Sequence, residues 1–125
     1  MFPLKRLKSF RFAFNGICNL IKKEHNARIH FVALMGAIGF GILFKISLNE
    51  WIAITIVSGL VILTELINTA IEQLADFVEP ERNEKIGLIK DYCAGAVLIS
   101  AIIALIVGAL IFTPKLTEIV KTIHP

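Results

Sequence analysis

Three long apolar stretches follow one another along this chain, and short polar segments separate them. They cover residues 29 to about 46, 51 to about 78 and 88 to 112. A helix needs about 20 apolar residues to cross a hydrocarbon core of ~30 Å. The pattern therefore predicts three transmembrane helices, of which the first is barely long enough to span.

The segment before these spans, residues 4 to 22, has a different pattern. Its apolar residues recur at helical spacing and its basic residues lie mostly opposite them, which is typical of a helix lying in the membrane interface. Gly16 weakens the middle, so two short helices are an alternative. An inert surface anchor is the alternative to a functional role.

The composition agrees with one membrane domain. The chain has 125 residues, of which 56% are hydrophobic and 18% charged, and this is too apolar for an ordinary soluble domain. We expect a single all-α integral membrane domain over residues 1–125, with no processing. No nucleic-acid-binding module is visible, and Cys18 and Cys93 have no metal-ligand spacing.

Basic residues predict the orientation, because loops rich in lysine and arginine stay in the cytosol. They gather before the first span and between the second and third spans, and they are sparse elsewhere: Lys5, Arg6, Lys8, Arg11, Lys22, Lys23 and Arg28, then Arg82, Lys85 and Lys90. We therefore expect a cytosolic N-terminus and a cytosolic loop at residues 79–87.

Polar residues within the second span share one helical face. At 100° per residue, Asn68, Thr69, Glu72 and Asp76 all fall within about 60° of Glu65, so the five residues span an arc of about 100°. An acidic residue inside the bilayer costs roughly 2.5–3.5 kcal/mol, and such residues usually carry chemistry or transport. Carboxylates of this kind suit Mg²⁺, which is commonly held by one or two carboxylates together with substrate phosphates.

Several interpretations of these polar residues stay open. The chain has no P-loop and no protein-kinase motif, so kinase chemistry would have to be built from membrane helices. A small proton-coupled transporter would use Glu65 and Glu72 as a carboxylate relay, and an inactive membrane subunit would use Glu65 only for a helix–helix hydrogen bond. His25 and His30 are interpreted as interfacial polar residues.

Small residues recur every four positions on two of the predicted spans, so backbones can approach closely there. They serve either a contact between subunits or packing within the chain. The two sets are Ala33, Ala37 and Gly41, and Ala96, Ser100, Ala104 and Gly108.

The run from Glu65 to Asp76, ELINTAIEQLAD, resembles the signature of the small prokaryotic diacylglycerol kinases and undecaprenol kinases. These are three-span enzymes that phosphorylate lipid alcohols with ATP. The resemblance extends from about Lys5 to Phe112, and Ala75 is a departure, since the family more often has valine there. It implies a Mg²⁺- and ATP-dependent lipid kinase, a homotrimer, of the bacterial cytoplasmic (inner) membrane.

The resemblance also implies roles for individual residues. Glu65 matches the catalytic base, and Asn68 matches a residue that orients Glu65 or the substrate. Glu24 and Glu72 match the carboxylates that hold the metal with the ATP phosphates. On the residues alone, Glu24 would be an exposed interfacial charge.

The remaining implied contacts lie at the same membrane face. The Lys90–Asp91 pair matches a phosphate-binding lysine and a supporting aspartate, although it would otherwise be an ordinary solvated pair. Lys5 matches a residue that contacts the lipid substrate together with Glu65. Three further residues match nucleotide contacts, namely Asp76, Glu81 and Asn83. The sequence does not separate diacylglycerol from undecaprenol as the substrate.

Overall fold

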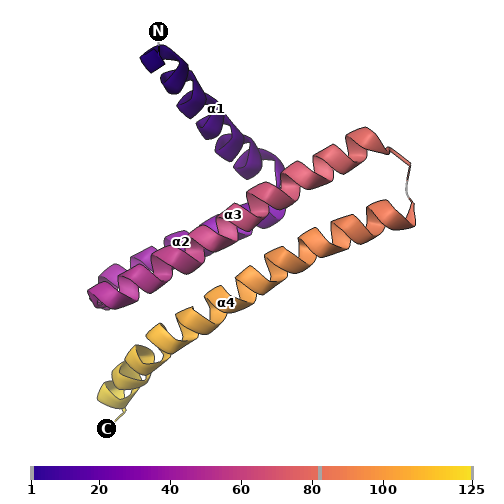
Figure 1. The fold of residues 1–125 in the computed structure, drawn as a ribbon. Coiled ribbons are helices and arrows are strands. Elements are labelled where there is room, and N and C mark those ends of the chain that lie inside the picture. The colour runs from indigo at the N-terminus through magenta and orange to yellow at the C-terminus, as the bar shows by residue number, and fades with distance from the viewer. Residues whose placement is uncertain (1, 82, 125) are drawn as a thin grey trace.

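The computed structural model describes residues 2–81 and 83–124, with side chains from Leu4 onward. The chain forms α1 (Phe2–Lys23), α2 (His25–Leu43), α3 (Leu48–Val78) and α4 (Glu84–Ile123), arranged as in Figure 1. These described residues contain helices and no strand, which confirms the all-α prediction. Arg82, counted above among the cytosolic basic residues, lies outside the described residues.

Three of the helices, α2, α3 and α4, are long and apolar enough to cross a membrane. The predicted number of spans is therefore confirmed. The remaining helix, α1, projects away from the other three in Figure 1 and is continuous through Gly16. Only Glu24 separates α1 from α2, so the chain changes direction sharply at this residue.

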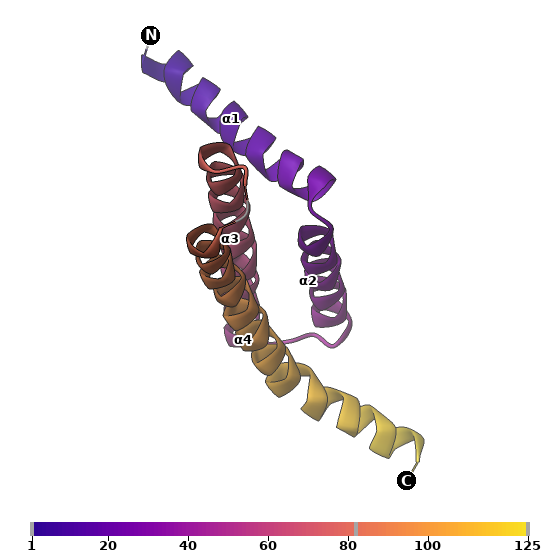
Figure 2. The same ribbon diagram turned by 90° about the vertical axis from the view of Figure 1, so that its right-hand side faces the viewer.

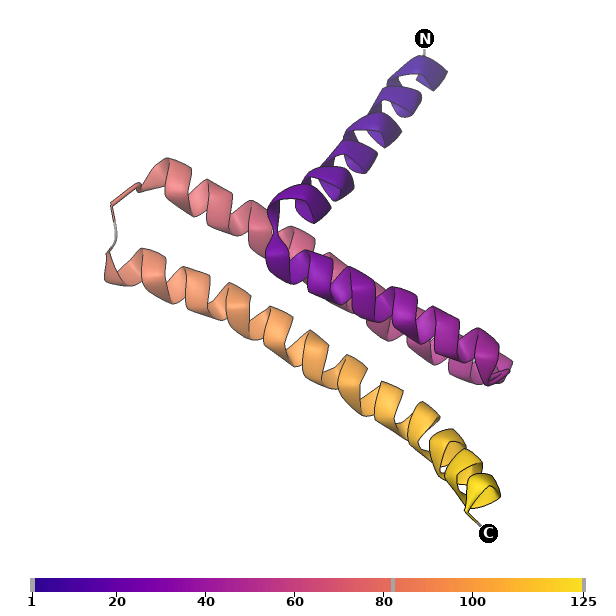
Figure 3. The same ribbon diagram turned by 180° about the vertical axis from the view of Figure 1, so that it is seen from behind.

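The antiparallel pair of α3 and α4 is held by three polar contacts, and Figure 3 shows the two helices running side by side. Lys90 Nζ lies 2.6 Å from Asp76 Oδ1 near the connecting loop. The Thr64 and Ser100 hydroxyls share a hydrogen bond of 2.9 Å between the two ends.

At the opposite end, Lys115 Nζ donates to both carboxylate oxygens of Glu50, at 3.1 and 3.2 Å. Glu50 and Asp76 are about 39 Å apart along α3 at 1.5 Å per residue. The two ion pairs therefore bracket a length close to the full thickness of a bilayer.

The best-packed apolar region lies at the Glu50 end. Ile46, Ile54 and Ile111 are buried there, with Trp51 packed against them. Gly41 is buried beside the Trp51 ring, so this member of its small-residue set serves packing within the chain. The same role falls to Ser100 in the other set, because its contact is with Thr64.

Two helix ends show how local sequence sets the boundaries. Ser47 and Glu50 form a reciprocal capping box that starts α3 after a short turn. α4 continues through Pro114 to Ile123, beyond the predicted span that ends at residue 112. Figure 2 shows α4 curving away from α3 toward this end.

Candidate active site beneath the N-terminal helix

Glu65 is the centre of the site because it is a carboxylate buried within a membrane-spanning helix. It lies on α3 and is only 4% exposed. It faces α1 and α2, whereas its neighbour Thr64 contacts Ser100 on α4. Two adjacent residues of α3 therefore point in different directions: Thr64 packs against α4, and Glu65 faces the site.

His30 of α2 faces Glu65 directly. Its Nε2 lies 3.2 Å from Glu65 Oε1. The distance is that of an ion pair, but Oε1 still has no aligned hydrogen-bond partner among the described residues. Catalytic hydrogen bonds are often poorly aligned before substrate binds, and the short distance leaves His30 within hydrogen-bonding reach of the carboxylate.

The sequence interpretation treated His30 as an interfacial polar residue and gave it no role. A signal was available, because Ala27 and His30 are three residues apart and share one face of α2. The facing partner on α3 was not readable from the sequence.

A small cavity lies between α1, α2 and α3 beside this pair. It has a volume of about 50 Å³, and both His30 and Glu65 line it. A cavity needs only about 10–15 Å³ to hold one water molecule, so this one has room for a small group. Its surface is apolar, and the remaining lining residues come from all three helices: Ile17, Leu20, Ile21, Ala27, Phe31 and Ile62.

The polar stripe continues from Glu65 along α3 with atoms that lack partners. Asn68 Oδ1 and Thr69 Oγ1 are buried and have no hydrogen-bond partner among the described residues. Leaving such a group unpaired costs about 1–3 kcal/mol, so each one calls for a bound water, ion or ligand. These atoms mark the stripe as a binding surface.

The two predicted metal ligands, Glu24 and Glu72, gather near Glu65. Both are half-buried, and both are near enough to interact electrostatically with it. Glu24 is the N-cap residue of α2, but its side chain makes no capping hydrogen bond. The described residues contain no cluster of three or more metal-ligating side chains. Two carboxylates with phosphate and water oxygens are, however, a usual set for Mg²⁺.

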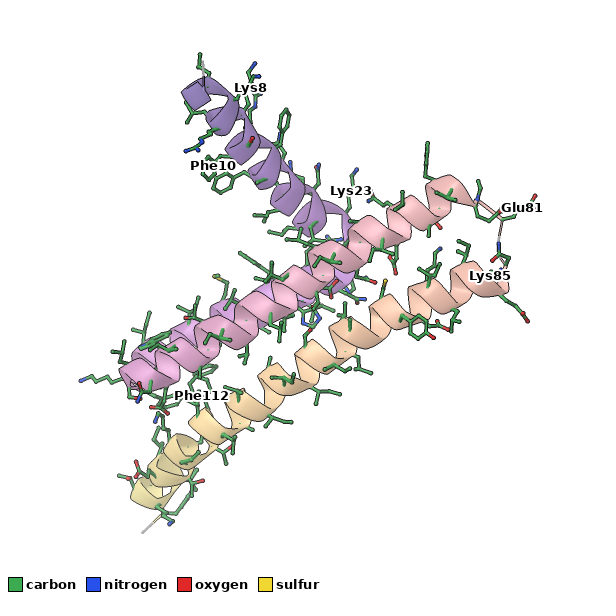
Figure 4. All side chains as sticks on the ribbon, viewed as in Figure 1. Lys8, Phe10, Lys23, Glu81, Lys85 and Phe112 are labelled. Carbon is green, nitrogen blue, oxygen red and sulfur yellow. The ribbon has the colours of Figure 1, made fainter. Side chains whose placement is uncertain are left out.

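The predicted nucleotide-binding residues lie farther along, where α3 and α4 are joined. Asp76 and Lys90 form the 2.6 Å ion pair described above. Asn83 and Asp91 line an open hollow at the start of α4. Asn83 also caps α4 by accepting a hydrogen bond of 2.9 Å from the Ile86 N–H. Glu81 is exposed in the loop, close to the start of α4 in Figure 4.

Lys5 is the predicted site residue that the fold leaves apart from Glu65. It is exposed on α1, and α1 meets the cavity through Ile17, Leu20 and Ile21. Lys5 and Ile17 are about 18 Å apart along the helix at 1.5 Å per residue. The described arrangement therefore brings the C-terminal half of α1, and not Lys5, over the site.

Comparison with known proteins identifies the family. The profile described as prokaryotic diacylglycerol kinase matches residues 11–112. The chain is 38% identical to the undecaprenol kinase of Bacillus subtilis (strain 168) over 109 residues, which cover 87% of this chain and 89% of that protein. It is 34% identical to the diacylglycerol kinase of Synechocystis sp. over 114 residues, which cover 90% of this chain and 65% of that protein.

These matches confirm the resemblance, and the matched residues 11–112 cover most of the predicted range from Lys5 to Phe112. They give no support to the transporter alternative. The chain belongs to the prokaryotic diacylglycerol kinase family of membrane lipid kinases.

Proposed function

We propose that this protein transfers the γ-phosphoryl group of ATP to the primary hydroxyl of a membrane lipid. The observation that carries the proposal is Glu65, buried at a cavity under an interfacial helix and followed along α3 by unpaired oxygens. A lipid hydroxyl enters such a site from the membrane, whereas ATP enters from the water. Both relatives described above are named as kinases of lipid alcohols, which supports this assignment.

Glu65 acts as the general base in this proposal. It accepts the hydroxyl proton as the lipid oxygen attacks the γ-phosphorus atom and the bond to the leaving ADP breaks. The apolar cavity between α1, α2 and α3, which Glu65 lines, receives lipid carbon atoms next to the reacting hydroxyl. Asn68, one turn farther along α3, orients the hydroxyl or a phosphate oxygen with its side-chain amide.

Glu24 and Glu72 would hold Mg²⁺ together with the ATP phosphates, and their oxygen donors fit that ion. The ion would neutralise charge on the transferring phosphoryl group. Lys90 binds a phosphate oxygen and exchanges its present contact with Asp76 for that interaction. Asp91, Glu81 and the Asn83 region contribute to the nucleotide end of the site.

We further propose a homotrimer in the bacterial cytoplasmic (inner) membrane with α1 and the α3–α4 loop on the cytosolic side. The crowding of basic residues at these two segments supports this orientation, since ATP is cytosolic. Large apolar side chains of α4 remain exposed within one chain and are available to lipid or to neighbouring copies: Leu98, Ile99, Leu105, Ile106 and Leu110.

The test is transfer of radiolabelled phosphate from ATP to undecaprenol and to diacylglycerol, measured side by side in lipid–detergent micelles with Mg²⁺. Glu65→Gln keeps the size of the side chain and removes the base, and we expect about 10²–10⁴-fold slower turnover. Glu118→Gln makes the same change on the exposed end of α4 and should leave turnover unaffected.

The substrate that the wild-type protein phosphorylates names the lipid class. A folded wild-type protein that phosphorylates neither lipid would refute the proposed function. Full activity of Glu65→Gln would refute the role given to Glu65 alone.

A further inference from the structure

His30 is the ionisable group that the structure places against Glu65 and that the mechanism above does not use. Its side chain is 25% exposed, while that of Glu65 is 5% exposed. His30 belongs to α2, so it approaches Glu65 from a different helix. The other charged groups near enough to act electrostatically on Glu65 are the carboxylates Glu24 and Glu72, which cannot donate a hydrogen bond to it when ionised.

A buried base needs a fixed orientation to meet a substrate. A carboxylate at the end of a glutamate side chain has several rotatable bonds, and the cavity beside Glu65 is otherwise apolar. A hydrogen-bond donor bound to one carboxylate oxygen restricts the rotation of the side chain. The second carboxylate oxygen then remains available for the lipid hydroxyl. His30 Nε2 lies 3.2 Å from Oε1, so a small realignment of the ring would bring such a donor to it.

We propose that His30 is a positioning residue for Glu65, with its Nε2–H donating to Oε1 once the lipid is bound. This inference rests on the proposed lipid kinase function. It predicts an effect on turnover, because the orientation of the base matters for chemistry and not for the binding of ATP.

Lipid kinase assays of single and double variants test the role. His30→Ala should lower kcat roughly 10–100-fold, the range found for groups that orient metal ligands through a hydrogen bond, with the KM for ATP unchanged. His30→Gln retains an N–H donor on a side chain of similar reach and should recover a large part of the loss. His124→Ala removes an exposed histidine at the far end of α4 and serves as the control.

The double variant separates positioning from a general structural effect. In a Glu65→Gln background, His30→Ala should cause no further fall in kcat, because the base it positions is already absent. The same fold-loss in both backgrounds would overturn the inference, as would full activity of His30→Ala. A wild-type protein with no lipid kinase activity would instead overturn the proposed function.

A second, independent observation concerns the C-terminal part of α4. The ion pair of Lys115 with Glu50 marks one boundary of the bracketed span, yet the helix continues to Ile123. These last eight residues add about 12 Å of helix at 1.5 Å per residue. Leu116, Ile119, Val120 and Ile123 are 41–66% exposed.

These four apolar residues lie within an arc of about 100° on the helix, and the charged residues Glu118 and Lys121 lie outside it. Such a stripe is typical of a helix that lies in the membrane interface. Pro114 cannot donate a backbone hydrogen bond, which allows α4 to bend where Figure 2 shows it curving away from α3. The segment that carries the stripe belongs to the same continuous helix as the membrane-spanning part of α4.

We infer that residues 115–123 lie along the lipid surface at the membrane face opposite α1, with the apolar stripe in the lipid. We assign the bilayer as the partner that covers the stripe, because the stripe begins next to Lys115, where the helix leaves the membrane.

Site-directed spin labelling in nanodiscs of phosphatidylcholine and phosphatidylglycerol tests this inference. Single cysteines are placed at residues 116 to 123 in a full-length chain in which Cys18 and Cys93 are replaced by alanine. Labels at the four stripe positions should be accessible to oxygen and shielded from nickel chelate, and labels at Glu118 and Lys121 should show the reverse. Equal access to nickel chelate at every position would overturn the inference. Spin–spin broadening at the stripe positions together with exclusion of oxygen, which indicates that a second copy covers the stripe, would also overturn it.

Discussion

Gly41 gives the sharpest prediction about stability because a side chain there has no space. A Cβ atom added to Gly41 would lie 2.6 Å from Cη2 and 3.0 Å from Cζ2 of Trp51, and 3.0 Å from Cδ1 of Ile46. Trp51 and Ile46 belong to the best-packed apolar region of the chain, so neither can move away freely. Gly41→Ala should therefore overpack this end of the bundle.

The size of the effect follows from a matched substitution on the same helix. Gly39→Ala would meet no atom within 4 Å. Both changes replace glycine by alanine within α2, so the gain in helix propensity, up to about 1 kcal/mol, is common to both. The difference between them isolates the packing cost, which is about 1–3 kcal/mol for an inserted methylene in a filled core.

Unfolding by SDS in mixed micelles measures this difference, with the fluorescence of Trp51, the single tryptophan, as the signal. Gly41→Ala should unfold at lower SDS than Gly39→Ala. Equal midpoints for the two variants would refute the packing argument, because the propensity terms cancel between them.

Three further substitutions test other contacts. Glu72→Gln should raise the Mg²⁺ concentration needed for half-maximal lipid kinase activity, measured by titration at fixed ATP; an unchanged requirement would contradict its role as a ligand. Lys90→Gln should raise the KM for ATP about tenfold or more, because a hydrogen bond to a charged group contributes roughly 1.5–3 kcal/mol, and the exposed Lys85→Gln is its control. Ser100→Ala should lower stability by about 0.6 kcal/mol, and by about 1.7 kcal/mol at most, through loss of the hydrogen bond to Thr64, with turnover retained; a large loss of turnover would show that this pair belongs to the site.

The sequence was sufficient for the helices because membrane spans depend on local composition. The three apolar stretches predict α2, α3 and α4, and the amphipathic pattern of residues 4–22 predicts α1. The end of α4 was less accessible, since a proline usually marks a boundary but a helix can continue past it when only one hydrogen bond is lost. The periodicity did not show that residues 115–123 continue the same helix.

From the sequence, only those site residues that share one face of a single helix could be placed together. Glu65, Asn68 and Glu72 are related by the geometry of α3 alone, so their common direction could be read from spacing. The approach of His30 to Glu65 depends on how α2 packs against α3, and the sequence carries no direct signal of that distance. The separation of Lys5 from Glu65 likewise depends on the direction in which α1 leaves the bundle.

The polar atoms of α3 divide into those that have a partner on another part of the chain and those that have none among the described residues, and the second group lies along the helix from Glu65. On the side toward α4, Thr64 has the Ser100 hydroxyl as its partner, and the helix ends are joined by the ion pairs of Glu50 and Asp76. The buried oxygens of Asn68 and Thr69, by contrast, have no partner among the described residues. A membrane helix selected only for packing would pair or remove such atoms, because hydrocarbon offers them nothing to bind. Retaining them unpaired beside a buried carboxylate is the arrangement expected of a surface that pairs them with substrate.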